Sequence, residues 1–319
     1  MINLKQELAE AETIAISGHV RPDGDCVGAT TAMYQYVKKL IPGAQVDLYL
    51  EQPSEVFSFL KGYEYINSKY DKEMVYDVFI ALDCGDEDRL GDAAKYYESA
   101  RKTICVDHHI SNTGFADVDY IVPTASSTCE LIFDLIERIK LDVHIAESIF
   151  LGIVHDTGVF QYESTSPKTF EVAGILASFD FDRSGIIDRT FYQKSYIANQ
   201  ILGRALLESF LIMDGKCIVS MVDRKTMEFY DALPRSLEGI VNQLRITRGV
   251  ECAIFLHETG IQEYKVSMRS NRIVDVAKIA AVFGGGGHIR AAGCTMNGTF
   301  HDVINNLSYY IEKQLCGQE

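Results

Sequence analysis

The chain has 319 residues, of which 47% are hydrophobic and 24% charged, and its formal net charge is −15. This length suits two domains of ordinary size, and no apolar run is long enough to span a membrane. The acidic balance argues against a surface that grips long nucleic acid, because that affinity depends on Lys and Arg at phosphates. The cysteines are scattered singly and the chain starts as a charged amphipathic segment, so we expect a cytoplasmic protein with reduced thiols.

The first half of the chain alternates short apolar strands with helical stretches. Three strand patterns end at His19, Asp83 and Asp107, and a fourth spans 45–50. Helical patterns cover 28–40 and 127–139. Nearly continuous apolar runs are typical of strands buried on both faces. Their alternation with helices predicts an α/β fold with a parallel sheet.

The second half has a different organisation. We expect the first domain to cover 1–190, a helical linker 191–215, and a smaller α/β domain 216–319. In the smaller domain, strand patterns cover 216–222, 249–256 and 263–270, a glycine run lies at 284–287, and a helical pattern covers 302–315.

Asp and His residues recur where the elements of the first half end. They are His19, Asp23 and Asp25 after the first strand, Asp83 after the third, Asp107, His108 and His109 after the fourth, and Asp156 at the end of an apolar run. Ligands of an open parallel sheet bind outside the carboxyl ends of its strands, so all of these residues can converge on one crevice. Carboxylates and imidazoles bind divalent metals, and without a thiolate among them Mn²⁺ or Mg²⁺ is favoured over Zn²⁺.

The residue types also suggest how two ions would be shared. One ion would take His19 and Asp23 and the other Asp25 and Asp156, while Asp83 would bridge them, because a buried carboxylate needs a compensating cation. One imidazole of the His-His pair can complete the second ion while the other faces substrate, and Asp107 can orient a ring. The alternative is that Asp23 and Asp25 are turn residues or helix caps and His19 a packed histidine. Cys26 and Cys84 adjoin these positions, and we expect both to serve packing.

The glycine run of the second domain forms a candidate anion site. Backbone N–H groups at Gly286 and Gly287, with the side chains of His288 and Arg290, can surround a phosphate, and Arg269 and Ser270 end a preceding strand. From Arg245 to Arg290 there are seven basic and four acidic residues. The alternative interpretation is a flexible glycine turn with ordinary surface charges.

Together these motifs resemble the DHH phosphoesterases. His-x3-Asp-x-Asp at 19–25, the lone Asp83, Asp-His-His at 107–109 and Asp-Thr-Gly at 156–158 are similar to the four motifs of that family. Gly-Gly-Gly-Gly-His at 284–288 resembles the substrate-binding loop of its associated C-terminal domain. The resemblance covers nearly the whole chain and is strongest to the standalone members of the nanoRNase and pAp-phosphatase type. It suits an active cleft between the two domains that admits only short substrates.

The resemblance implies a role for each site residue. His19 and Asp23 would bind the first ion, and Asp25, His108 and Asp156 the second, with Asp83 bridging. His109 would contact the scissile phosphate, where Arg89 would help unless it forms a structural ion pair. The implied cofactors are two divalent ions, Mn²⁺ first, with Mg²⁺ or Co²⁺ as alternatives, and water would attack phosphorus directly. His155 departs from the small polar residue expected there, which bears on substrate preference.

The implied function is Mn-dependent hydrolysis of short oligoribonucleotides, such as nanoRNA and pApA, with removal of the 3′-phosphate of pAp. One alternative is a phosphodiesterase specific for cyclic di-AMP or pApA. Others are a pyrophosphatase or polyphosphatase, a long-strand exonuclease and a non-catalytic nucleotide sensor. The expected partners are short oligonucleotides and nucleoside bisphosphates, with neither long nucleic acid nor membrane, and the sequence leaves a homodimer open.

Overall fold

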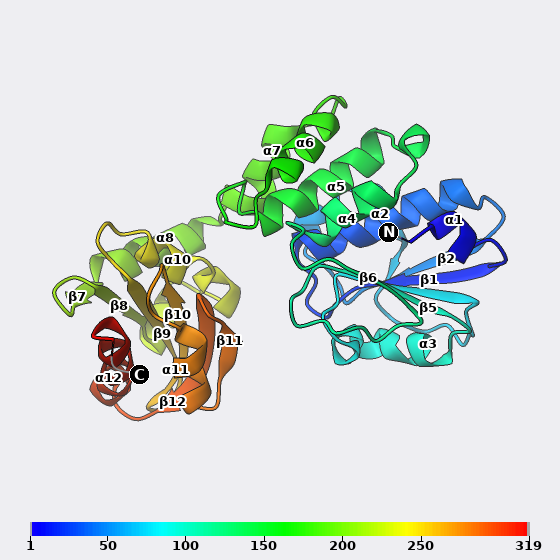
Figure 1. Ribbon diagram of the computed structural model, residues 1–319. Coiled ribbons are helices and arrows are strands. Elements are labelled where there is room, and N and C mark those ends of the chain that lie inside the picture. Colours follow the sequence, from blue (N-terminus) through cyan, green and yellow to red (C-terminus); the bar gives the residue numbers. More distant parts are fainter. Residues whose placement is uncertain (1, 318–319) are drawn as a thin grey trace. The chain divides into compact units, whose positions relative to one another are not determined.

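The computed structural model of the protein describes residues 2–317 and divides into two compact units, Met1–Gln193 and Lys194–Glu319 (Figure 1). The segment 191–215, expected as a linker, contains helix α8 and strand β7, and β7 is the edge strand of the second unit's sheet. Within residues 2–317, no helix is both long and apolar enough to cross a bilayer.

The first unit is built on a six-stranded parallel sheet with the order β3-β2-β1-β4-β5-β6. Its strands are β1 (Thr13–Ser17), β2 (Gln45–Tyr49), β3 (Ile66–Asn67), β4 (Val78–Leu82), β5 (Thr103–Asp107) and β6 (Val118–Ile121). The predicted α/β class with a parallel sheet is confirmed.

Helices cover both faces of this sheet (Figure 1). They are α1 (Leu4–Glu7), α2 (Gly24–Leu40), α3 (Ala94–Ser99), α4 (Thr128–Leu135), α5 (Val143–Asp156), α6 (Pro167–Leu176) and α7 (Arg183–Ile187), with 3-10 turns at Glu55–Phe57, Tyr63–Tyr65, Glu87–Ala93 and Arg138–Lys140 and a π turn at Asp188–Tyr192. Alternate strand residues enter two cores: Ile14 and Ile16 pack under α2, α4 and α5, whereas Ala15 joins the aromatic core beside α3. The central strands β1, β4 and β5 are almost fully buried because each face of the sheet is covered there.

The second unit contains a six-stranded mixed sheet with the order β11-β12-β10-β9-β8-β7. Only β8 and β9 run parallel. Its elements are α8 (Tyr196–Leu207), β7 (Phe210–Ile212), β8 (Cys217–Val222), α9 (Arg224–Phe229), α10 (Ile240–Arg245), β9 (Cys252–Gly260), β10 (Glu263–Ser270), α11 (Val276–Val282), β11 (Gly286–His288), β12 (Ala291–Asn297) and α12 (Phe300–Leu315), with a 3-10 turn at Pro234–Leu237. Helices α11 and α12 cover one face, and α8 and α10 the other.

The predicted glycine loop is largely a strand. Gly286–His288 forms β11, which pairs with the start of β12. A side chain at Gly285 would place its Cβ 2.2 Å from the carbonyl oxygen of Gly293, and one at Gly287, where φ is +143°, would lie 2.4 Å from that of Ala291. Glycine is therefore needed for the close approach of the two strands.

Candidate metal centre

The loop after β1 carries the first two candidate ligands. The Nδ1 atom of His19 lies 2.8 Å from the carbonyl oxygen of Val20, so that nitrogen carries a proton and Nε2 is the atom that faces the cluster. Nε2 is 3.7 Å from Oδ1 of Asp23 and 3.6 Å from Oδ2 of Asp83. Asp23 is also the N-cap of α2, since its Oδ1 accepts the N–H groups of Asp25 and Cys26 at 3.1 Å. The cap and ligand interpretations of Asp23 are therefore compatible.

Asp83 lies at the centre of the cluster, directly after β4, and is 2% exposed. Its φ of +55° places it in the left-handed region, which Asp and Asn adopt more readily than most residues. Its Oδ2 faces His19, whereas its Oδ1 is 3.7 Å from Nε2 of His108 and 3.8 Å from Nδ1 of His109. The two oxygens of one carboxylate thus face two different groups of ligands.

Asp25 lies in the first turn of α2 and is fully buried. Its two oxygens accept the backbone N–H groups of Thr128, at 2.7 Å, and Cys129, at 3.0 Å, at the start of α4. A buried carboxylate at a helix N-terminus is stabilised by those donors and by the helix dipole. Asp25 is therefore fixed by an element more than one hundred residues further along the chain.

His108 and Asp156 complete the second group of ligands. Nε2 of His108 is 2.9 Å from Oδ2 of Asp156, the last residue of α5, and 4.0 Å from Oδ2 of Asp25. The other ring nitrogen of His108 faces the carbonyl oxygen of Ala125 at 3.4 Å. Candidate ligand atoms of Asp25, His108 and Asp156 lie within 4.8 Å of one another, as do those of Asp83, His108 and His109.

His109 is oriented by the buried carboxylate that precedes the His-His pair. Nδ1 of His109 is 2.7 Å from Oδ1 of Asp107, and the other oxygen of Asp107 accepts the amide of Asn112 at 2.8 Å. Asp107 raises the pKa of His109, although burial opposes the imidazolium charge. Nε2 of His109 is left to donate a proton to a bound anion.

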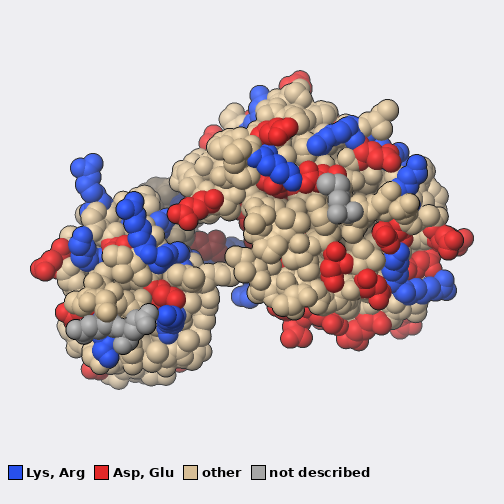
Figure 2. Space-filling model, viewed as in Figure 1, with Lys and Arg blue, Asp and Glu red and all other residues tan. Residues whose placement is uncertain are grey.

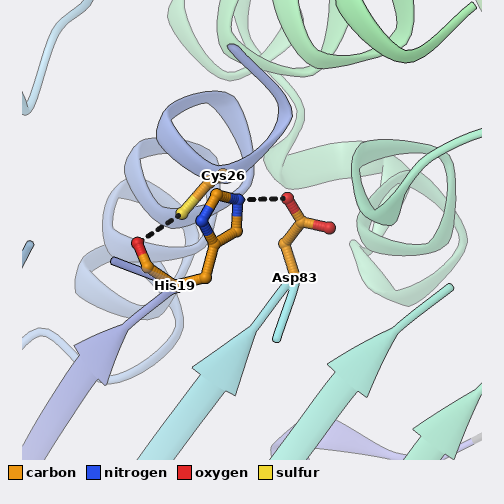
Figure 3. Close-up of side chains that lie close together, drawn as sticks. All are labelled: His19, Cys26 and Asp83. Atoms are coloured by element: carbon orange, nitrogen blue, oxygen red, sulfur yellow. Dashed lines mark hydrogen bonds and ion pairs between the residues drawn. The ribbon is translucent and has the colours of Figure 1, made fainter. Parts of the chain in front are cut away.

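Cys26 belongs to a third such group, since its Sγ atom and candidate ligand atoms of His19 and Asp83 lie within 4.8 Å of one another. Its Sγ atom points to the carbonyl oxygen of His19, at 3.9 Å, while the ring of His19 points to Asp83 (Figure 3). A Cβ at Gly18 would lie 2.3 Å from this sulfur, so the thiol fills the space beside β1. Burial raises the pKa of the Cys26 thiol well above its usual range. These contacts fit the packing role expected for Cys26, and its distance from His19 and Asp83 would also allow the thiol to bind an ion there.

The electrostatics of the cluster suit bound cations. Although burial opposes its charge, the carboxylates of Asp23 and Asp83 raise the pKa of His19 to about 10. Burial and the neighbouring charges of Asp83 and Asp156 raise the pKa of Asp25. Such a set of buried carboxylates is stable only with compensating positive charge. Oxygen and imidazole donors that converge in this way fit divalent Mn²⁺ or Mg²⁺.

Two further residues of the first half contact the segment that carries His19 and Asp23. The backbone carbonyl of Arg89 accepts the N–H of Val20 at 2.8 Å, and among the described residues its guanidinium makes no ion pair. The ring of His155 packs against Gly24, where a Cβ would lie 2.2 Å from the ring, and its Nε2 bonds the hydroxyl of Thr190 at 2.9 Å. His155 therefore supports the loop that carries Asp23.

The substrate-binding candidates of the second unit do not share one environment. His288, Gly286 and Gly287 are exposed on β11, whereas Ser270 is 3% exposed at the end of β10. The guanidinium of Arg290 donates to the carbonyl oxygens of Val274, at 2.9 Å, and Arg272. Nη1 of Arg269 donates to the carbonyl of Met268 at 2.9 Å. The structure thus gives Arg290 a role in holding the segment before α11.

The charge of the chain is concentrated in the first unit. Residues 1–193 contain 16 Lys or Arg and 32 Asp or Glu, whereas residues 194–319 contain 14 and 13. Figure 2 shows acidic side chains spread over the surface of the first unit, on the right of the view. The unit that carries the candidate metal ligands is therefore the one that repels anions, and bound cations would offset this repulsion.

Two residues of the site were not found by sequence reasoning. Thr128 contacts both Asp83 and Asp25, and Asn112 holds Asp107. Their partners lie between 5 and 103 residues away in the chain. The one available signal was the Ser127-Thr128 pair at a helix start, and it indicates a cap rather than a site residue.

Comparison with known proteins agrees with this fold. Residues 13–153 match the DHH family N-terminal domain, and residues 214–315 match the DHHA1 domain. The chain belongs to the DHH family and is a phosphoesterase, that is, a hydrolytic enzyme. The resemblance drawn from the motifs is confirmed.

Individual relatives narrow the comparison further. The chain is 28% identical over 291 residues to the bifunctional oligoribonuclease and PAP phosphatase NrnA of Thermus thermophilus, covering 89% of this chain and 84% of that protein. An exopolyphosphatase-related protein from Bacteroides fragilis superposes with a TM-score of 0.89 at 25% identity, over 99% of this chain and 96% of that one. RecJ of Thermus thermophilus in complex with Mn²⁺ shares the fold, with a TM-score of 0.56 at 16% identity over 97% of this chain and 54% of RecJ.

Proposed function

We propose that the protein is a metal-dependent phosphoesterase that hydrolyses short oligoribonucleotides, including pApA, and removes the 3′-phosphate of pAp. The observation that carries this proposal is Asp83, whose two oxygens face His19 on one side and His108 on the other. The activity follows the name of the Thermus thermophilus relative. The cysteines, all within the described residues, form no disulfide, and seven of the eight are buried, which fits a reducing compartment, and we place the protein in the cytoplasm.

The residues divide into two ligand groups joined by Asp83. His19 and Asp23 would hold one ion, and Asp25, His108 and Asp156 the other. We take Mn²⁺ as the preferred ion, because oxygen ligands predominate and RecJ, which shares the fold, was solved with Mn²⁺. When bound, such ions lower the pKa of a water ligand and neutralise charge on phosphoryl oxygens.

The chain itself supplies positioning and a proton donor. Nδ1–H of His19 donates to the Val20 carbonyl, so Nε2 is the ring nitrogen that is presented to the cluster. Asp107 holds His109 by Nδ1 and favours its charged form, so Nε2–H of His109 can donate to a phosphate oxygen and stabilise the charge that develops there. Arg89, which has no carboxylate partner in the described chain, can serve the same phosphate.

Recognition of a terminal phosphate would come from the second unit. The exposed imidazole of His288 and the glycine backbone of β11 offer donors to an anion. Arg269 and Ser270 end strand β10, which is separated from β11 by β12. The near-neutral charge of that unit places no net repulsion against a phosphate. Arg290 would act indirectly, through the segment that it holds.

A substrate panel tests the proposal. Pure protein with Mn²⁺ is incubated with pAp, pApA, a 5-mer, a 24-mer, cyclic di-AMP and pyrophosphate, and products are followed by chromatography. We expect mononucleotides from pApA and the 5-mer, AMP from pAp, and no turnover in excess EDTA. Preferred hydrolysis of cyclic di-AMP or of pyrophosphate would contradict the proposed substrate class, and turnover in EDTA would contradict the metal centre.

A further inference from the structure

We propose that Thr128 is a positioning residue of the metal centre, acting through the orientation of Asp83. Thr128 is the first residue of α4 and is fully buried. Its hydroxyl donates to Oδ1 of Asp83 at 3.0 Å, and its backbone N–H donates to Oδ2 of Asp25 at 2.7 Å. One residue outside the ligand set thus bonds two of the ligands. The inference rests on the proposed metal centre.

The hydroxyl is needed because the carboxylate torsion of an aspartate is soft. The χ2 angle of Asp has a broad, roughly two-fold distribution, so the side chain alone does not fix where each oxygen points. The Thr128 hydroxyl occupies one lone-pair direction of Oδ1, which leaves Oδ1 facing His108 and Oδ2 facing His19. A carboxylate that faces both ligand groups requires this orientation.

The position of Thr128 in its helix commits the hydroxyl to Asp83. A threonine inside a helix usually donates to a carbonyl one turn earlier. Thr30, equally buried in α2, does so, since its hydroxyl bonds the carbonyl of Cys26 at 2.8 Å. At the first position of α4 the preceding turn does not exist, and Ser127 already caps the helix. The Thr128 hydroxyl bonds a different element instead.

The expected consequence concerns metal affinity rather than folding. Partners that hold metal ligands in place change metal affinity by about 10- to 100-fold when they are removed. We expect a loss in this range when the Thr128 hydroxyl is deleted. The backbone bond from Thr128 to Asp25 is retained in any substitution except proline, so the start of α4 stays anchored.

The experiment compares Thr128→Ser with Thr128→Ala, which differ from one another by one hydroxyl. Mn²⁺ affinity of the full-length protein is measured from the aqueous Mn²⁺ signal in electron paramagnetic resonance, and melting in EDTA shows that each variant is folded. Thr128→Val, which keeps the shape of the side chain, is the substitute if the alanine variant unfolds. Thr30→Val is the matched control for loss of a buried hydroxyl.

We expect the alanine or valine variant to bind Mn²⁺ about 10- to 100-fold more weakly than Thr128→Ser, and Thr30→Val to bind as the wild type does. Equal affinities of the serine and alanine variants would overturn the inference, and so would an equal loss in Thr30→Val. If the wild type bound no Mn²⁺, the proposed metal centre itself would fail, a result distinct from either.

Discussion

The substitution Asp83→Asn separates metal binding from folding more cleanly than any other change in the cluster. Asparagine keeps the size of the side chain and tolerates the φ of +55°, whereas alanine would add backbone strain there. The change removes the one charge that faces both His19 and His108. We therefore expect loss of metal binding and of hydrolysis in a folded protein.

The magnitude follows from mass action on the folded state. An ion present at 100 times its dissociation constant stabilises the fold by about 2.7 kcal/mol. For a unit of the size of Met1–Gln193, each kcal/mol raises Tm by about 2–4 °C. The wild type should therefore gain roughly 5–11 °C per bound ion, and Asp83→Asn little of this.

In the metal-free protein two effects of the substitution oppose each other. Burial lowers the pKa of His19 and Asp83 raises it, so the attraction between Asp83 and the His19 imidazolium stabilises the fold. Burial and the charge of Asp83 both raise the pKa of Asp25, so the repulsion between the two carboxylates destabilises the fold. Because Asp83→Asn removes both, the Tm in EDTA should change less than the wild-type Tm does on addition of Mn²⁺.

Scanning calorimetry or fluorescence melting with and without Mn²⁺ measures these shifts. The matched control is Asp142→Asn, which removes the ion pair with Lys39, keeps a side-chain oxygen to cap α5, and contacts no candidate ligand. It should lower Tm and keep the Mn²⁺-induced shift. An Asp83→Asn protein with the full Mn²⁺-induced shift would refute the bridging role. A variant that is unfolded in EDTA would refute the expectation that the lost attraction to His19 and the lost repulsion from Asp25 offset each other.

Other predictions concern single groups of the site and the choice of substrate. Asp107→Asn should lower kcat by about 100-fold or more and, because Asp107 raises the pKa of His109, move the alkaline limb of the pH–rate profile to lower pH. Metal-free protein should lose stability as pH rises from about 6.5 to about 10, because His19 and His108 have raised pKa values when folded and their charged forms stabilise the fold only below those values; a flat stability curve in EDTA would contradict this. His288→Ala should reduce turnover of a 5′-phosphorylated dinucleotide more than that of bis-p-nitrophenyl phosphate, and equal losses would exclude a recognition role. Catalytic efficiency at ~0.1 M salt should fall steeply from a 5-mer to a 24-mer and less steeply as salt screens the acidic surface, whereas equal efficiency at both lengths would favour a long-strand exonuclease.

The sequence was most informative where strands are buried on both faces. β4 is apolar throughout and β1 and β5 have apolar centres, so the pattern of apolar residues locates their carboxyl ends, and with them His19, Asp83 and Asp107. Helix α2 begins at Gly24 rather than at Gly28, because Asp23 caps it while its carboxylate also lies beside His19. The local sequence pattern therefore does not show that Asp23 both caps the helix and lies in the site.

Contacts between distant segments were beyond local patterns. Thr128 bonds Asp83, 45 residues away in the chain, and Asp25, 103 residues away, and no sequence motif has a fixed spacing of this length. The glycine run gave no periodicity because glycine has no side chain to bury, so strand β11 forms only through its pairing with β12. Arg290 was expected at substrate, but its guanidinium bonds backbone carbonyls that a charge count does not reveal.

Anomalous diffraction at the manganese absorption edge tests the two-ion centre most directly. Crystals of wild-type protein grown with Mn²⁺ should show two anomalous peaks, one beside His19 and Asp23 and one beside Asp25, His108 and Asp156, with Asp83 between them. Crystals of Asp83→Asn grown under the same conditions should show neither at full occupancy. A single peak remote from Asp83 in the wild type, or two full peaks in the variant, would contradict the account.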